Sequence, residues 1–191
     1  MQVLIKDLKN HLGETVEING WVSNLRSSGK IAFWQVRDGS GFAQAVLSSD
    51  NLNEEKWALV NSVTQESSVQ ISAEVTKHPK KEEYELQVSD LKIYQISEEW
   101  PIGNKDHGID FLMDNRHLWL RAKRQWAIQR VRNTLIQATY QYFGSHDFTK
   151  IDSPILTPNA GENTTDLFRV KYFDEEAYLS QTGQLYLEAA L

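Results

Sequence analysis

The first 97 residues contain a series of short segments with the composition of β-strands, separated by turn-forming or helical stretches. Valine, isoleucine and aromatic residues are enriched in these segments, as is typical of strands. There are five of them, at residues 16–22, 32–36, 42–47, 68–75 and 85–93. A chain with this pattern is constrained to a β-rich domain in its first half.

Two of the connections indicate how the five strands are arranged. Residues 37–41, Arg-Asp-Gly-Ser-Gly, predict a hairpin between the second and third strands, because glycine adopts positive φ without a steric cost. Residues 53–63 have helical propensity, with Asn53 as a candidate N-cap and acidic residues in the first turn. Three strands, a helix and two further strands predict a β-barrel of the OB-fold type.

The second half of the chain has a different character. Residues 98–114 are polar, contain glycine and proline, and are interpreted as a hinge between domains. Residues 115–143 have helical periodicity and predict one long amphipathic helix, with Gly144 as a left-handed residue that ends it. We expect short strands at residues 148–152 and near Tyr178, and a helix beginning at Gln184.

Composition excludes several classes of protein and site. The chain has no cysteine, which excludes disulfides and thiolate zinc sites, and its five histidines lack ligand-like spacing, so no metal site is expected. No apolar run is long enough to span a membrane and no signal peptide is recognisable, so we expect a cytoplasmic protein without membrane contact.

The formal net charge of -6 argues against general affinity for nucleic acid, so any such binding is expected to be local. Basic residues do cluster between residues 116 and 132. The alternative for this cluster is a solvated helix face with no ligand.

Four segments together resemble the asparaginyl-tRNA synthetases, which are related to the aspartyl enzymes of class IIb. They are residues 20–44, 111–121, 148–158, and 162–168 taken with 178–188. The resemblance covers almost the whole chain, with the segments in the family's order. It implies an OB-fold anticodon-binding domain over residues 1–97, the hinge at 98–114, and over 115–191 the incomplete start of an α+β class II catalytic domain, an antiparallel sheet with helices.

In the first domain the resemblance implies contacts with the anticodon loop of tRNA. Phe33 would stack on an anticodon base, Gln44 would hydrogen-bond an edge of that base, and Arg26 would contact the backbone or a base. Composition alone favours the alternative that Phe33 is part of the barrel core. Trp21 and Trp34 are assigned to the core or to packing between domains.

Residues 148–158 resemble class II motif 1, which implies a homodimer whose interface includes Pro154. The alternative is a helix that packs only on its own domain. The last segment resembles the edge of the amino-acid site: Glu162 would meet the substrate ammonium group, while Gln184 and Thr182 would hold the amino-acid backbone. Glu162 and Glu188 could instead be solvated surface residues.

One position bears on the choice of substrate. The aspartyl enzymes carry a lysine that pairs with the substrate carboxylate where this chain has Leu187, followed by Glu188. A missing cation favours asparagine, and we hypothesise that Glu188 accepts a hydrogen bond from its carboxamide nitrogen.

The implied activity of the full-length enzyme is ligation of asparagine to its tRNA, with ATP and Mg²⁺, through asparaginyl-adenylate. The catalytic motifs 2 and 3 are not found in these residues, so we expect a fragment that contains no catalytic residue, needs no cofactor and cannot complete adenylation alone. The alternatives are an aspartyl-tRNA synthetase, a synthetase paralogue, and a non-catalytic tRNA-binding module.

Overall fold

The computed structural model describes residues 1–80, 82–103, 105–158 and 167–190. The chain divides into two compact units, Met1–Asp114 and Asn115–Leu191, which are described separately below.

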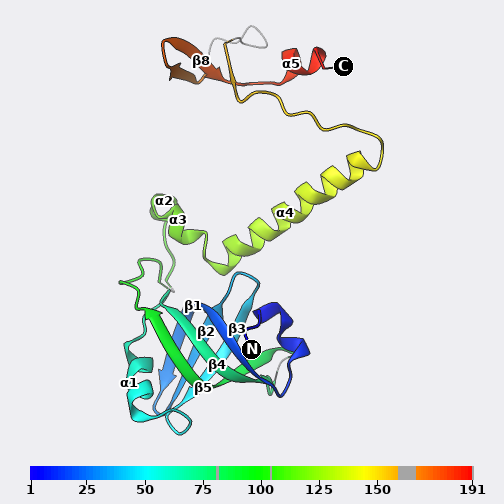
Figure 1. The fold of residues 1–191 in the computed structure, drawn as a ribbon. Helices are drawn as coiled ribbons and strands as arrows, with labels where there is room; N and C mark the ends of the chain where they lie inside the picture. Colours follow the sequence, from blue (N-terminus) through cyan, green and yellow to red (C-terminus); the bar gives the residue numbers. More distant parts are fainter. Residues whose placement is uncertain (81, 104, 159–166, 191) are drawn as a thin grey trace. The chain divides into compact units, whose positions relative to one another are not determined.

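The first unit is a closed five-stranded barrel (Figure 1). Its strands follow one another around the barrel in the order β1-β2-β3-β5-β4, and every pairing is antiparallel except that of β3 with β5. The strand bounds are β1 Thr15–Ser28, β2 Ile31–Arg37, β3 Phe42–Ser48, β4 Ser68–Lys77 and β5 Tyr84–Gln95. The predicted five strands and the OB-fold class are therefore confirmed.

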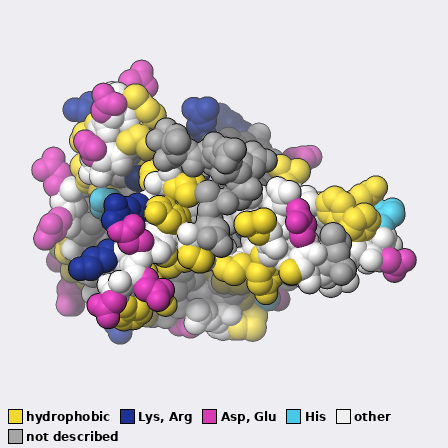
Figure 2. Space-filling view, turned by 90° about the horizontal axis from the view of Figure 1, so that it is seen from above, with side chains coloured by type: hydrophobic (Ala, Val, Ile, Leu, Met, Phe, Trp, Pro, Cys, Tyr) yellow, Lys and Arg dark blue, Asp and Glu magenta, His cyan; other side chains and the backbone are white. Residues whose placement is uncertain are grey.

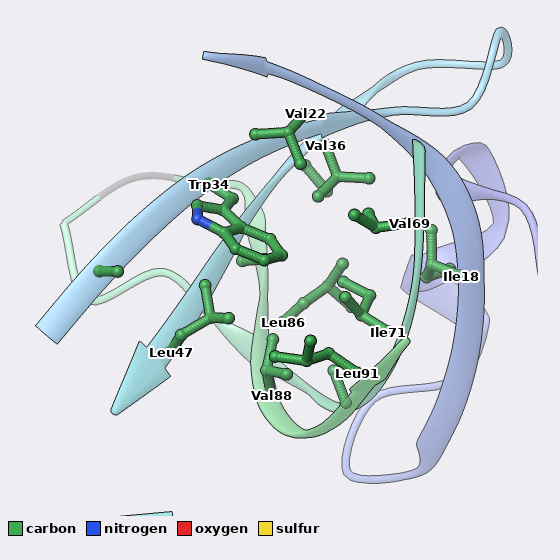
Figure 3. Packing of buried hydrophobic residues seen from close by; sticks show 14 of the residues in the cluster. Ile18, Val22, Trp34, Val36, Leu47, Val69, Ile71, Leu86, Val88 and Leu91 are labelled. Carbon is green, nitrogen blue, oxygen red and sulfur yellow. The ribbon is translucent and has the colours of Figure 1, made fainter. Parts of the chain in front are cut away.

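Alternating side chains of all five strands fill the barrel (Figure 3). Trp34 is the largest fully buried side chain and is 1% exposed, which confirms its assignment to the core. A short 3-10 helix that the sequence did not predict, η1 (Ile5–Asn10), adds Ile5 and Leu8 to the same core. Most of the apolar burial that stabilises this unit is therefore in one cluster.

The aspartate of the predicted hairpin turn joins two parts of the barrel. Asp38 accepts hydrogen bonds from the backbone N–H of Ser40 and of Gly41, while its other oxygen accepts one from the N–H of Ile5 at 2.7 Å. Gly39 between them has φ +84, a conformation that favours glycine. One carboxylate thus shapes the β2–β3 turn and attaches η1 to it.

Helix α1 (Glu54–Ser62) connects β3 to β4, as predicted. The side chain of Asn53 accepts a hydrogen bond from the Lys56 N–H at 2.8 Å, which satisfies one of the unpaired donors of the first turn. Val60 and the flanking residues Leu52 and Val63 are buried in the barrel core cluster.

The helical part of the second half differs from the prediction. Instead of one helix from residue 115, α3 (Arg116–Trp119) is separated from α4 (Lys123–Gly144), because Ala122 has an extended backbone with ψ 142. The prediction rested on apolar residues repeated at helical spacing, and these begin at Ile128. The pattern was therefore evidence for α4 alone. Within the proposed hinge, residues Ile109–Asp114 form α2.

Gly144 is the last residue of α4 and does not have positive φ, so the predicted left-handed glycine is wrong. The left-handed residue is Asp147, at φ 62. The next turn is closed by two backbone hydrogen bonds: the Ser145 N–H donates to the Gln141 carbonyl at 2.9 Å, and the His146 N–H donates to the Phe143 carbonyl at 3.0 Å.

A three-stranded sheet of order β6-β8-β7 completes the second unit. Its strands are β6 Leu156–Thr157, β7 Arg169–Tyr172 and β8 Glu175–Leu179, and it is followed by helix α5 (Gln184–Glu188). The strand near Tyr178 and the helix at Gln184 are confirmed. The strand predicted at residues 148–152 is wrong, because no described strand pairs with that segment.

The second unit leaves much of its apolar surface open. Hydrophobic side chains lie exposed in Figure 2, and along α4 they include Val131 at 60%, Leu135 at 62% and Tyr142 at 59% exposure. Ala177 is the one hydrophobic residue of this unit that is buried among those described. In the described parts of the chain, no helix combines the length and the apolar character needed to cross a membrane.

Candidate nucleic-acid interface

Two rows of side chains cross the outer face of the barrel on β1, β2, β3 and β5. The rows follow from the strand register, since residues paired across neighbouring strands point to the same face. One row is Arg26, Phe33, Val46 and Gln87, and the adjacent row is Asn24, Gln35, Gln44 and Glu85. The structure thus brings Arg26, Phe33 and Gln44, which the sequence singled out separately, onto one surface.

These side chains contact one another in a continuous chain. The Arg26 guanidinium lies over the Phe33 ring, 4.7 Å from its centroid, and its Nη2 donates to Gln44 Oε1 at 3.3 Å. Gln44 Nε2 in turn donates to Glu85 Oε1 at 2.5 Å. Because both ends of the Gln44 amide have partners, its orientation on the face is defined.

The face is shallowly hollowed and its aromatic ring is accessible. A hollow of about 270 Å³ is lined by Arg26, Phe33, Gln44 and four of their neighbours. Phe33 is half-buried at its surface, whereas the adjacent Trp34 points into the core. The alternative that Phe33 belongs to the core is therefore wrong. A planar base can stack on such a ring while the amide and the guanidinium bind its edge and a phosphate.

Trp21 does not belong to the core either, because it is 41% exposed. Its ring lies on the Arg37 guanidinium, 5.7 Å from the ring centroid. Strand propensity could not distinguish Trp21 from Trp34; the register does, since Trp21 pairs with Arg37 and Ser68 on β2 and β4 with its side chain outward.

Glu85 is a site residue that the sequence did not reveal. It is 6% exposed, accepts the Gln44 hydrogen bond and lies 3.5 Å from His78 Nε2. Its position depends on the parallel pairing of β3 with β5, which sets Glu85 beside Gln44. The strand order of an OB barrel, applied to the fifth segment, would have identified it.

A second, smaller group of predicted residues lies around α5. Gln184 donates its backbone N–H to Thr182 Oγ1 at 3.2 Å, and its side-chain Nε2 to Glu188 Oε1 at 2.8 Å. These three predicted residues are therefore adjacent and exposed. The fourth, Glu162, lies outside the described residues.

A hollow of about 210 Å³ lies next to this group and is lined by residues that include Pro154, Thr182 and Tyr186. Gly183 and Ser153 both line this hollow and lie close together. A side chain at position 183 would not fit, since a Cβ there would lie 2.7 Å from Ser153 Oγ. Pro154 itself is exposed. Among the described residues there is no cluster of three or more side chains suited to a metal ion.

Comparison with known families assigns both halves of the chain. Residues 16–94 match the OB-fold nucleic acid binding domain of the tRNA anticodon-binding type, and residues 108–191 match the class II tRNA synthetases for D, K and N. This chain joins an anticodon-binding domain to a class II tRNA synthetase domain.

Solved structures agree with this assignment along the whole chain. The asparaginyl-tRNA synthetase of Pyrococcus horikoshii, in complex with asparaginyl-adenylate, is 34% identical with a TM-score of 0.90 and covers 100% of this chain. The asparaginyl-tRNA synthetase of Entamoeba histolytica, also with asparaginyl-adenylate, is 29% identical with a TM-score of 0.82 over 99%. A candidate aspartyl-tRNA synthetase from Leishmania major is 26% identical with a TM-score of 0.81 over 100%.

The chain spans less than half of each of these structures, between 41% and 45% of their lengths. Within that span, the face formed by Arg26, Phe33, Gln44 and Glu85 belongs to the anticodon-binding domain, and the group around Gln184 belongs to the synthetase domain.

Proposed function

We propose that this protein is an asparagine–tRNA ligase, in which the present residues read the anticodon, contribute to a homodimer and form part of the asparagine pocket. ATP and Mg²⁺ would serve the full-length enzyme, which forms asparaginyl-adenylate and then esterifies the tRNA. The observation that supports this best is the accessible Arg26–Phe33–Gln44–Glu85 face on an anticodon-binding barrel.

Each side chain of the face has a separate task in this proposal. Phe33 provides the stacking surface for an unpaired base, since every base has a π-face. Gln44 offers a fixed amide to the edge of that base, held in place by Glu85. Arg26 supplies a positive charge that can reach the backbone or the base.

In the synthetase domain, Glu162 would bind the substrate ammonium group, with Thr182 and Gln184 positioning the amino-acid backbone. Glu188 accepts one hydrogen bond from Gln184, and an ionised carboxylate has further acceptor positions. It can therefore also accept from the carboxamide nitrogen of asparagine. Leu187 gives no cation to pair with aspartate, which supports the amide substrate.

The homodimer is supported by the open apolar side of α4, which includes Ile128, Val131 and Leu135. A stripe of this kind on a helix needs a cover in water. In a two-fold dimer, α4 and the segment through Pro154 would meet the same surface of a second copy.

Anticodon reading is tested by titrating the chain with the anticodon stem-loop of the asparagine tRNA. We expect Phe33→Ala to weaken binding by roughly 1–3 kcal/mol through loss of the stacked base. Ile31→Ala is the matched control, because Ile31 is an exposed apolar residue of the same strand that does not line the hollow. Equal affinity of the wild type and a folded Phe33→Ala variant would contradict the stacking role.

Substrate choice is tested by ATP–pyrophosphate exchange with asparagine and aspartate at equal concentrations. We expect the 191 residues alone to give no exchange and the full-length enzyme to respond to asparagine. The similarity to the Leishmania major protein favours an aspartyl-tRNA synthetase as the second candidate. Exchange that depends on aspartate in the full-length enzyme would decide for it.

A further inference from the structure

The segment from residue 115 to residue 146 contains no acidic side chain. It holds six of the chain's 20 Lys and Arg residues and none of its 26 Asp and Glu residues, so the other residues carry a formal net charge of -12. Such a separation of charge within one chain produces a local positive potential that the overall charge of -6 conceals.

Helix α4 displays part of this charge on a polar face, defined here as Lys123, Trp126, Arg130, Asn133, Thr134, Gln137 and Gln141. At 3.6 residues per turn these positions fall along one side of the helix. The apolar stripe of Ile128, Val131, Leu135 and Tyr142 lies on another side. The polar face extends for about 27 Å at 1.5 Å per residue.

The polar face is suited to phosphate groups more than to a protein surface. Lys, Arg, Asn, Gln and Thr side chains all donate hydrogen bonds to phosphate oxygens in complexes with nucleic acids. From Asn133 to Gln141 the face has no apolar side chain, whereas the cores of protein interfaces are apolar and poor in charge. The Arg130 guanidinium lies 5.2 Å from the centre of the Trp126 ring, which holds this cation on the face.

We infer that the polar face of α4 binds the sugar-phosphate backbone of a base-paired stem in the tRNA, outside the anticodon stem-loop. The inference rests on the proposed function for the choice of RNA. A stem is favoured over a single strand because single strands bind through several aromatic rings, and Trp126 is the one ring on this face. Phosphate contacts carry no base information, so this surface adds affinity without sequence preference.

The test compares two RNAs and two pairs of substitutions in the whole chain. The RNAs are the full-length asparagine tRNA and its isolated anticodon stem-loop, each titrated between 50 and 200 mM salt, a range of about fourfold over which phosphate contacts weaken strongly. The first variant is Lys123→Gln with Arg130→Gln. The matched control is Arg124→Gln with Arg132→Gln, which removes the same charge from α4 away from the polar face.

For full-length tRNA we expect the first variant to have a shallower slope of log K against the logarithm of the salt concentration. The magnitude of this slope should fall by about 2, which is about 1 for each lost cation. Binding of the stem-loop should not change, and the control variant should behave as the wild type with both RNAs. The same loss should appear with a tRNA whose anticodon has been altered. Far-UV circular dichroism should show equal helix content in both variants.

An unchanged salt dependence in the first variant, or an equal loss in the control variant, would overturn the inference. A change in sedimentation behaviour with tRNA affinity unaltered would assign the polar face to a protein contact instead. The proposed function fails separately: in that case Phe33→Ala would leave stem-loop binding unchanged while the effect of the α4 variant on full-length tRNA persisted.

Discussion

A buried ion pair joins β2 to the turn before β4. Arg37 donates two hydrogen bonds of 2.8 Å to the two carboxylate oxygens of Glu66, and their side chains are 8% and 3% exposed. Glu66 has φ 67, and its N–H donates to the Val22 carbonyl at 2.7 Å. A two-pronged contact of this kind fixes orientation as well as distance.

Removal of the arginine should be costly because the carboxylate would stay buried. We expect Arg37→Met to lower the free energy of unfolding by about 3–5 kcal/mol, measured by urea denaturation. Arg37→Met combined with Glu66→Leu should recover part of this loss, since neither charge then remains. A single variant within about 0.5 kcal/mol of the wild type would show that the pair is not required.

Gly20 lies against the same strand end. A Cβ there would be 2.5 Å from the Arg37 carbonyl oxygen, which is backbone and cannot turn aside. Gly20→Ala should therefore destabilise the barrel by about 1–3 kcal/mol in thermal unfolding. Gly144→Ala is the control: no atom lies within 4 Å of its Cβ position, and alanine favours the end of α4. Equal effects of both would contradict this explanation.

For single residues, the sequence predicted the position of a side chain well where a family motif contains that residue. It predicted the position poorly where the position depends on how neighbouring strands pair. Arg26, Phe33 and Gln44 came from the motif and lie together. Trp21 and Trp34 have the same composition signal, but only Trp34 enters the core. Glu85 was missed because it approaches Gln44 from 41 residues further along the chain.

Among the elements, α1 is attached to β5 by an ion pair. Lys56 Nζ lies 2.5 Å from Asp90 Oδ1, with the side chains 35% and 54% exposed. The hydrogen bond from Lys56 lowers the pKa of Asp90 below its ordinary value of 3.8. Because the folded-state pKa is the lower one, the pair stabilises the fold above pH about 4, and this stabilisation is lost as the pH falls through the folded-state pKa.

We therefore expect Lys56→Gln to lower the free energy of unfolding at pH 7 by less than about 1 kcal/mol, since the pair is partly exposed. The difference from the wild type should vanish as the pH falls below about 4, which chemical denaturation at a series of pH values would measure. Lys30→Gln is the control, because Lys30 and Asp50 are 3.7 Å apart and 80% and 74% exposed. If the difference in free energy of unfolding between the wild type and Lys56→Gln grew as the pH fell, the proposed direction of the Asp90 pKa shift would be contradicted.

The elements themselves were predictable where local chemistry determines them. The side chain of Asn53 caps α1, and each of the five barrel strands contains β-branched or aromatic residues. Residues 148–152 have strand composition, yet a strand also needs a paired neighbour, which composition cannot supply. The break between α3 and α4 at Ala122 lies before the first residue of the apolar period, so the periodicity could not reveal it.

Across the whole molecule, apolar burial is divided unequally between the two units. The core cluster lies entirely within residues 5–91, whereas α4 exposes most of its apolar side chains. Hydrogen exchange should reflect this in the monomeric chain: amides of β1 to β5 should be protected close to the global stability, and those of α4 should exchange by local opening. Equal protection in both units would show that α4 is covered in solution, as in the proposed dimer.

The parallel pairing of β3 with β5 has a consequence for how binding and folding are coupled. Gln44 and Glu85 are 41 residues apart in the sequence and become neighbours only when β5 pairs with β3, so this contact carries the loop-closure entropy of a long intervening segment. An RNA loop that needs both residues has no target in the unfolded chain. Mass action then makes the ligand a stabiliser of the closed barrel, by about 2.7 kcal/mol at a hundredfold excess over Kd.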